Sequence, residues 1–356
     1  MAGVQDLIEI GQSIWLDNIT RDLLDDGTIA GFIERLGVTG LTSNPSIFDK
    51  AISGSSSYDQ AIKSHAAEGR DPEETFFALA IDDLRRAADL FAPVARSTDG
   101  IDGWVSLEVS PTLADDTAAT VEAARRLHGE ADRPNLFIKI PGTPAGLPAI
   151  EEAIFAGVPV NVTLLFSTEQ YLAAADAYLR GLERRREAGL DLGVASVASL
   201  FISRWDVALA DQLPDELRNT IGVAVGASSY AAYRDLVASD RVVSLVAGGA
   251  PIQRLLFAST GTKDPAAPDT LYVSSLAAPD TVNTMPDGTL LAVADHGETP
   301  GPLRADGLVA GVILERASSH GADLDALAER LQREGAAAFV AAWDSMLGSI
   351  AEKAAG

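Results

Sequence analysis

The alternation of short apolar runs with longer amphipathic stretches constrains the fold of this chain more than any other feature. Most of the apolar runs are continuously apolar rather than alternating, as expected for parallel strands covered on both faces. Stretches with helical periodicity lie between them, for example Pro72–Leu90, Leu113–His128, Thr168–Glu187 and Ser228–Val237. Eight runs have the length and composition of strands: Ile14–Leu16, Gly40–Thr42, Trp104–Val109, Leu136–Ile140, Pro159–Thr163, Ala195–Leu200, Leu255–Ser259 and Leu271–Ser274.

Eight β/α units in one chain predict the α/β class and a single (β/α)8 TIM barrel. A doubly wound sheet is the structural alternative, and the lack of a GxGxxG motif after the first strand counts against it. The segment Asp323–Lys353 is predicted to be helical beyond the barrel. We therefore expect one domain over residues 1–356, in which a C-terminal helical extension of about residues 317–353 packs on the barrel. Apolar side chains fall on one face of this extension: Phe339, Trp343, Leu347 and Ile350.

Composition narrows the classes of partner. The chain has 356 residues, 47% of them hydrophobic, and 51 acidic residues against 27 basic ones, for a net charge of -24. This acidity argues against nucleic acid or an anionic membrane surface as the main partner. The absence of cysteine excludes disulfides and thiolate chemistry. The four histidines are scattered, so we expect no metal site and no cofactor.

The location and the assembly follow less directly from the sequence. The first 15 residues, MAGVQDLIEIGQSIW, lack a basic segment followed by a long apolar one, so we expect no signal peptide. No uncharged apolar run reaches the roughly 18 residues that a membrane-spanning helix needs. A cytoplasmic protein is therefore expected, and both a homodimer and a monomer are compatible with the sequence.

Polar side chains gather at the carboxyl ends of the predicted strands, where the active sites of TIM barrels lie. Each has a structural interpretation, since Asp17 could cap a helix and Glu108 could be a buried ion partner of Lys139. Their convergence at one end of one barrel favours an active site instead. In strand order they are Asp17, Thr42, Asn44, Glu108, Lys139, Asn161, Thr163, Ser199, Arg204, Ser259 and Lys263.

Lys139 is the unusual member of this set, because it interrupts the apolar run LFIKI. Burial in a low-dielectric barrel disfavours the charged form of an amine. The neutral amine can attack a ketone and form a Schiff base, which is an electron sink for carbon–carbon bond cleavage. Such a reaction needs proton shuttles, and two carboxylates in different environments, Asp17 and Glu108, suit these roles.

At this point the sequence resembles the transaldolase family, and most closely the longer form found in actinobacteria. Two long motifs support the resemblance, GLTSNPSIF at residues 40–48 and LFIKIPGTPAGLPA at residues 136–149. Four shorter motifs match in the same order: VSLEV, NVTLLFS, SLFISRWD and ASTGTKDP. The resemblance extends from about Trp15 to Met285, which is most of the chain.

The resemblance implies a transferase of the pentose phosphate pathway that works on phosphorylated sugars. It moves a dihydroxyacetone unit from sedoheptulose 7-phosphate to D-glyceraldehyde 3-phosphate, giving D-erythrose 4-phosphate and D-fructose 6-phosphate. Lys139 would form the Schiff base, Asp17 would take the C4 hydroxyl proton, and Glu108 would shuttle protons through a water held with Thr163. The implied substrate-binding residues are Thr42, Asn44, Asn161 and Ser199 for hydroxyls, and Arg204 and Ser259 for phosphate.

One departure affects the predicted phosphate site. Many transaldolases have a second arginine two residues after the position of Ser259, and this chain has Gly261 there. Lys263 is the nearest replacement. Two alternative functions stay open at this stage. One is a class I aldolase of the fructose 6-phosphate aldolase type, although those enzymes are shorter and have an amide at the position of Glu108. The other is a non-catalytic barrel that binds sugar phosphates.

Overall fold

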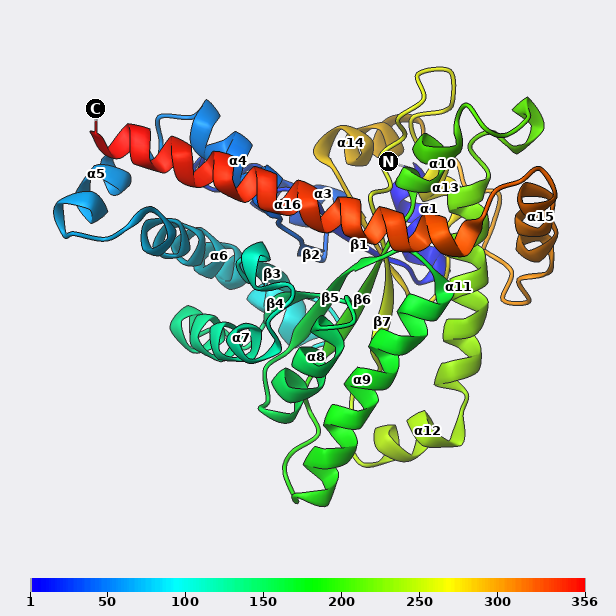
Figure 1. Cartoon of the computed structure of the whole chain (residues 1–356), viewed down its shortest axis with the longest axis horizontal. Coiled ribbons are helices and arrows are strands. Elements are labelled where there is room, and N and C mark those ends of the chain that lie inside the picture. The colour runs from blue at the N-terminus through cyan, green and yellow to red at the C-terminus, as the bar shows by residue number, and fades with distance from the viewer. Residues whose placement is uncertain (1, 356) are drawn as a thin grey trace.

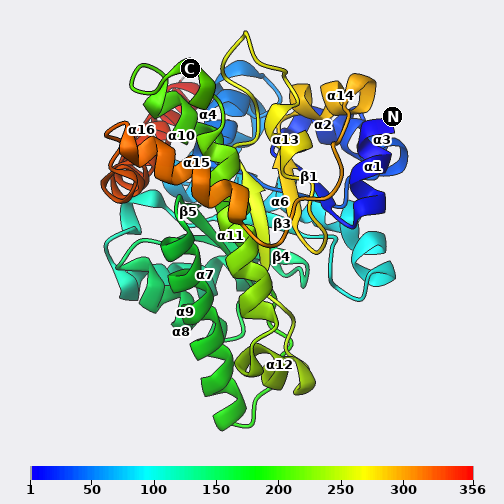
Figure 2. The ribbon, with the colours of Figure 1, turned by 90° about the vertical axis from the view of Figure 1, so that its right-hand side faces the viewer.

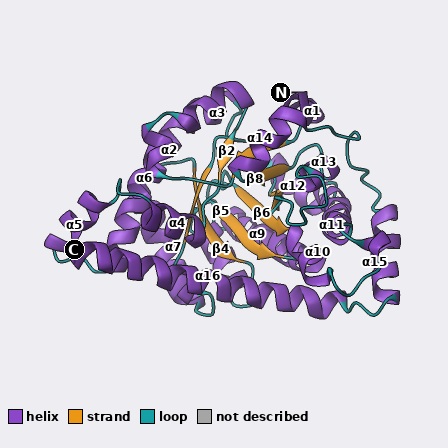
Figure 3. Ribbon diagram, turned by 90° about the horizontal axis from the view of Figure 1, so that it is seen from above, coloured by secondary structure: helices purple, strands orange, loops and turns teal. Residues whose placement is uncertain are grey.

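Eight parallel strands form the centre of the computed structural model, which describes residues 2–355. Their order in the sheet is β2-β1-β8-β7-β6-β5-β4-β3, and a parallel bridge between Gly40 and Trp104 joins β2 to β3 and closes the barrel. Figure 3 looks down on the strands inside a ring of helices. The TIM barrel is confirmed and the doubly wound alternative is wrong. The strands are β1 (Ser13–Leu16), β2 (Gly40–Leu41), β3 (Val105–Glu108), β4 (Leu136–Pro141), β5 (Val160–Leu165), β6 (Ser196–Phe201), β7 (Arg254–Ala258) and β8 (Val282–Met285).

Helices surround the barrel on all sides (Figures 1 and 2). None of the helices in the described part of the chain is both long and apolar enough to cross a membrane. The α-helices are α1 (Ala2–Ile10), α2 (Arg21–Asp25), α3 (Thr28–Leu36), α4 (Pro45–Gly54), α5 (Asp59–Ala67), α6 (Pro72–Ser97), α7 (Thr117–Ala131), α8 (Gly146–Phe155), α9 (Thr168–Glu187), α10 (Ser203–Leu209), α11 (Ile221–Val237), α12 (Asp240–Ala247), α13 (Leu271–Ser275), α14 (Asp287–His296), α15 (Leu308–Ser319) and α16 (Leu324–Ala355), with 3-10 turns η1 (Pro111–Leu113) and η2 (Asp215–Leu217).

The eighth strand differs from the prediction. The predicted strand Leu271–Ser274 is helical and belongs to α13, whereas the true last strand is Val282–Met285. Tyr272 and Val273 are buried in the core from a helix, so their apolar character did not identify a strand. The true strand has the sequence VNTM, whose polar residues Asn283 and Thr284 concealed it from a search for apolar runs. The other seven predicted strands overlap observed strands.

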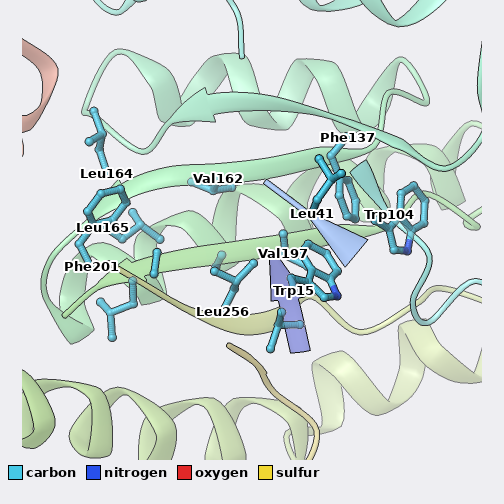
Figure 4. Packing of buried hydrophobic residues seen from close by; sticks show 14 of the residues in the cluster. Trp15, Leu41, Trp104, Phe137, Val162, Leu164, Leu165, Val197, Phe201 and Leu256 are labelled. Atoms are coloured by element: carbon cyan, nitrogen blue, oxygen red, sulfur yellow. The ribbon is translucent and has the colours of Figure 1, made fainter. Parts of the chain in front are cut away.

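Buried side chains fill the barrel at both ends (Figure 4). At the end where the strands begin, Trp104 and Phe137 stack with ring centroids 4.0 Å apart and Trp15 lies beside Phe137. Gly40 allows this crowding, because a Cβ there would lie only 2.7 Å from the ring of Trp15. Leu164, Leu165 and Phe201 lie at the opposite end, where the strands finish. That end also contains the polar residues singled out from the sequence.

The last helix, α16, packs back on the barrel. It contacts α4, α5, α6, η1 and β5. Phe339, Trp343 and Ile350 are buried, as the helical pattern predicts, and the ring of Trp343 packs edge-on against Phe76 of α6. Lys353 at the far end of the helix pairs with Asp59 of α5. In Figure 1 the helix runs as an orange-to-red rod across the molecule.

Candidate active site

A cavity of about 640 Å³ opens at the carboxyl ends of the strands. Nearly all the predicted site residues lie on its wall. Two further ones, Glu108 and Asn161, are buried beside wall residues, Glu108 next to Lys139 and Asn161 next to Ser199. The predicted residues that line the cavity are Asp17, Thr42, Asn44, Lys139, Thr163, Ser199, Arg204, Ser259 and Lys263.

Lys139 projects from the middle of β4 and is only 5% exposed. Its Nζ donates a hydrogen bond of 2.8 Å to the backbone carbonyl of Ser43 and lies 3.3 Å from Oε2 of Glu108. Beyond these two partners the amine faces the cavity. The turn after β4 depends on Gly146, since a Cβ there would lie 1.9 Å from the carbonyl oxygen of Pro141.

Glu108 ends β3 and is directly opposite Lys139 in the parallel register of β3 and β4. Burial raises its pKa to about 7, although the nearby ammonium of Lys139 opposes this shift. Its Oε1 and the Oγ1 of Thr163 are buried atoms without a hydrogen-bond partner among the described residues. At neutral pH Glu108 can therefore both give and take a proton, which is what a proton shuttle requires.

Asp17 follows β1, and its backbone N–H donates to the carbonyl of Met285 at the end of β8. The hydroxyl of Thr42 donates to Oδ1 of Asp17 over 2.7 Å and also contacts the hydroxyl of Thr284. Burial is the main cause that raises the pKa of Asp17, Asp287 raises it further, and Lys139 and Lys263 oppose these effects. The charge of Lys139 thus acts on both carboxylates, Asp17 and Glu108, which lie in different surroundings.

Amide and hydroxyl groups lie on the cavity wall or directly beneath it. Asn44 is the N-cap of α4, where its Oδ1 accepts a hydrogen bond from the N–H of Ile47, and Pro45 follows as the first helical residue. Ser199 donates to Oδ1 of Asn161 over 2.7 Å, and Asn161 donates to the hydroxyl of Ser106. These bonds fix the amide of Asn161, so the orientation of this polar wall is set before any ligand arrives.

The predicted phosphate residues lie on the loops after β6 and β7. Ser259 has a φ of 56°, in the left-handed region that non-glycine residues rarely adopt. Its hydroxyl is 2.9 Å from that of Ser203, the residue before Arg204. Lys263 is exposed, but its Nζ lies 3.8 Å from the place where a Cβ on Gly261 would be. The lysine thus brings its ammonium back over the position at which the family often has arginine.

Several residues on the wall were not predicted. Phe339 of α16 reaches the cavity, where its ring centroid is 6.0 Å from Nζ of Lys139. Its helical periodicity predicted burial but gave no signal that it would lie beside the lysine. Thr284 was missed together with β8. Asn18 also lines the cavity and donates to Asp287, at the start of α14. Among the described residues, no group of three or more His, Cys, Asp or Glu is arranged to hold a metal ion.

Comparisons with known proteins agree with this geometry. The family described as Transaldolase/Fructose-6-phosphate aldolase matches residues 14–350. The chain belongs to this family. It is 45% identical to a protein named "Transaldolase" from Thermobifida fusca, over 99% of this chain and 98% of that protein. It is 46% identical to a "Transaldolase" from Mycolicibacterium smegmatis, over 95% of this chain and 93% of the relative.

A third relative, "Transaldolase 1" from Streptomyces coelicolor, is 45% identical over 98% of this chain and 93% of its own length. The resemblance to transaldolases that the motifs indicated is therefore confirmed. Because the family match begins at residue 14 and ends at residue 350, it includes Asp17 at one end of the site and Phe339 of α16 at the other.

Proposed function

We propose that this chain is a transaldolase that uses Lys139 to form a Schiff base with a ketose phosphate. It transfers a dihydroxyacetone unit from sedoheptulose 7-phosphate to D-glyceraldehyde 3-phosphate, giving D-erythrose 4-phosphate and D-fructose 6-phosphate, a step of the pentose phosphate pathway. The single observation behind this proposal is a buried lysine amine, 3.3 Å from a carboxylate, that faces a polar cavity at the carboxyl ends of the barrel strands.

Formation of the imine requires proton transfers at the carbon that Lys139 attacks. The amine adds to the ketone carbon, and the resulting hydroxyl leaves as water after it receives a proton. Glu108 is the nearest carboxyl group to the amine. Within residues 2–355, Oε1 of Glu108 and Oγ1 of Thr163 have no hydrogen-bond partner, which supports a role in which the two residues hold a water that relays these protons.

Cleavage then needs a second base near Lys139. Asp17 would remove the proton from the C4 hydroxyl, so that the C3–C4 bond breaks and the electron pair flows into the iminium ion. The hydrogen bond from Thr42 orients the Asp17 carboxylate for this step. Asn44, Asn161 and Ser199 would hold the hydroxyls of the dihydroxyacetone unit, since these side chains offer both donors and acceptors. Arg204, Ser259 and Lys263 would bind the phosphate.

The alternative of a fructose 6-phosphate aldolase is less well supported, although the family includes both activities. The fructose 6-phosphate aldolases have an amide side chain at the position that Glu108 occupies in this chain. A carboxyl group with a pKa of about 7 can return a proton, whereas an amide cannot. The three relatives compared above are named transaldolases, which favours transfer over release of free dihydroxyacetone.

A coupled assay separates the two activities. The chain is supplied with fructose 6-phosphate, with and without erythrose 4-phosphate, and both free dihydroxyacetone and the transfer product are measured. A transaldolase turns over rapidly only when the acceptor is present. Borohydride reduction with fructose 6-phosphate should add a dihydroxyacetone-sized mass to Lys139, and Lys139→Met should abolish both the adduct and turnover. Labelling of a different lysine would refute the assignment.

A further inference from the structure

The C-terminal helix α16 contacts β5, the strand of Thr163, as well as the helices on one side of the barrel. Figure 3 shows it running along one side of the strands, and in Figure 1 it passes over the region where β5 and β6 end. A helix of 32 residues that only covered the outside of the barrel would not need to reach the cavity. This one contributes Phe339 to the cavity wall.

Two contacts, made by Gln332 and Gly335, fix the position of α16 on the barrel. Gln332 is buried, and its side-chain amide donates to the carbonyl of Gly142, after β4, and to that of Leu164, in β5. Leu164 has a φ of 60° at a register shift between β5 and β6. One helical turn further, Gly335 lies so close that a Cβ would meet Leu164 Cδ2 at 3.0 Å. The helix is therefore fixed against the strands of Lys139 and Thr163.

Phe339 lies one turn beyond Gly335 on the same face of α16 and is 4% exposed. Its ring forms part of the apolar portion of the cavity wall, and the ring centroid lies 6.0 Å from Nζ of Lys139. The amine also contacts the carboxylate of Glu108, at 3.3 Å, and the carbonyl of Ser43, at 2.8 Å. An aromatic ring in this place removes one route by which water could reach a carbon bound to Nζ, and its face favours a cation there.

We propose that Phe339 is a specificity-determining residue that shields the dihydroxyacetone intermediate on Lys139 from water and so favours transfer over hydrolysis. This inference rests on the proposed function. After cleavage of the ketose, the unit remains as an enamine on Nζ. Loss by hydrolysis requires protonation of the enamine carbon, addition of one water to the resulting iminium carbon and rupture of the carbon–nitrogen bond, which frees dihydroxyacetone and restores the amine. Transfer requires an aldehyde at the same enamine carbon instead.

The test compares substitutions of Phe339 by the ratio of free dihydroxyacetone to transferred unit, with fructose 6-phosphate as donor and erythrose 4-phosphate as acceptor. Phe339→Ala opens the shield and should raise this ratio about tenfold, whereas Phe339→Leu keeps an apolar cover and should raise it no more than about threefold. The ratio for Phe339→Val should lie between the ratios for the alanine and leucine variants. If Phe339→Ala does not unfold cooperatively, Phe339→Val replaces it in the comparison.

Ile350→Ala is the matched control. Ile350 is 1% exposed on the same helix but does not line the cavity, so its truncation loosens the packing of α16 without opening the shield. The control should leave the ratio unchanged. An unchanged ratio in Phe339→Ala overturns the inference, and so does an equal rise in Ile350→Ala, because loosening of the helix would then explain both. If the wild type forms no borohydride adduct and transfers nothing, the proposed function fails instead.

Discussion

Lys263 brings a positive charge to the loop after β7, where Gly261 offers no side chain. The phosphate of the proposed substrates is a dianion, and a single arginine, Arg204, would meet it in a chain of net charge -24. Arg204 is also partly buried, which lowers its pKa from the ordinary value. A second cation near Ser259 is therefore expected to contribute to phosphate binding, together with the backbone amides of the loop.

Substitution of Lys263 tests this role. Lys263→Ala should raise the KM for the phosphorylated acceptor about tenfold and lower kcat much less, because the phosphate contact is made in the ground state as well as in the transition state. Lys63→Ala is the matched control, since Lys63 is an exposed lysine of α5 away from the cavity and its loss changes the net charge equally. Steady-state kinetics of both variants give the KM and kcat values for this comparison. Equal changes in KM would mean that Lys263 acts only through net charge.

Glu108 links the chemistry of the site to the pH dependence of stability. Its pKa is raised from 4.5 to about 7 by burial, with Lys139 opposing the shift. The folded protein therefore binds the proton of Glu108 more tightly than the unfolded chain. This contribution to stability is fully present below pH 4.5 and is lost as the pH rises through about 7.

Removal of the carboxyl group should remove this pH dependence. Relative to Glu108→Gln, the wild type should lose about 2 kcal/mol of unfolding free energy between about pH 5 and about pH 8. Urea denaturation of both proteins at the two pH values measures the difference. If the difference in unfolding free energy between the two proteins is the same at both pH values, or changes in the opposite direction, the pKa of Glu108 is not raised.

At the scale of elements, the interface of α16 with the barrel depends on a buried polar contact as well as on apolar packing. Gln332 donates to two backbone carbonyls, and its own side chain is buried among the strands' ends. Loss of the amide would leave the carbonyls of Gly142 and Leu164 without this donor in a place that water reaches poorly. Such buried unpaired groups are more costly than the mean value of a hydrogen bond suggests.

Gln332→Leu should therefore lower the free energy of unfolding by about 2–3 kcal/mol. Gln212→Leu is the control, because Gln212 also donates to a backbone carbonyl, that of Ala208, but from an exposed position. Gln212→Leu should change the free energy of unfolding by no more than about 0.5 kcal/mol. Thermal or urea unfolding of the two variants gives the comparison. If Gln332→Leu were as stable as the control, the contact would have no part in fixing α16.

Elements also show what the sequence could and could not predict. The apolar runs of β3 to β7 were recognisable, because parallel strands covered on both faces need continuous apolar side chains. β8 was not recognisable, since its Asn283 and Thr284 point to buried polar partners, Thr260 and Thr42, at the mouth of the barrel. Phe339 was predicted to be buried, yet its contact with Lys139 depends on how α16 lies against β5 and the turn after β4, and the two residues are 200 positions apart in the sequence.

At the scale of the whole molecule, the cavity differs from the chain in its balance of charges, because its wall has four basic residues, Lys50, Lys139, Arg204 and Lys263, and two acidic ones, Asp17 and Asp22. Three of the five lysines in the chain line this cavity. Over the whole chain, acidic residues outnumber basic ones by 51 to 27. This distribution reconciles a net charge of -24 with anionic substrates, because the local field in a recessed site depends mainly on its own charges.

The barrel closes between β2 and β3, and we call this junction the seam. β2 has only two residues, and the seam is held by hydrogen bonds from Leu41 to the carbonyl of Trp104 and from Gly103 to that of Thr39. Between β5 and β6, in contrast, the pairing extends along most of both strands. A short ladder has few bonds to break, so local opening of the barrel should begin at this seam.

Native-state hydrogen–deuterium exchange should therefore find the amides of Leu41 and Gly103 less protected than that of Val160, which pairs with β6. Equal protection of these three amides would mean that the barrel opens as one unit. The wall residues Thr42 and Asn44 directly follow the short strand, and the amine of Lys139 reaches across the seam to Ser43. The hydrogen bond from Nζ of Lys139 to the carbonyl of Ser43 therefore connects β4 to the segment after β2 across this seam, and the imine of the proposed mechanism would leave Nζ with fewer protons to donate to that carbonyl.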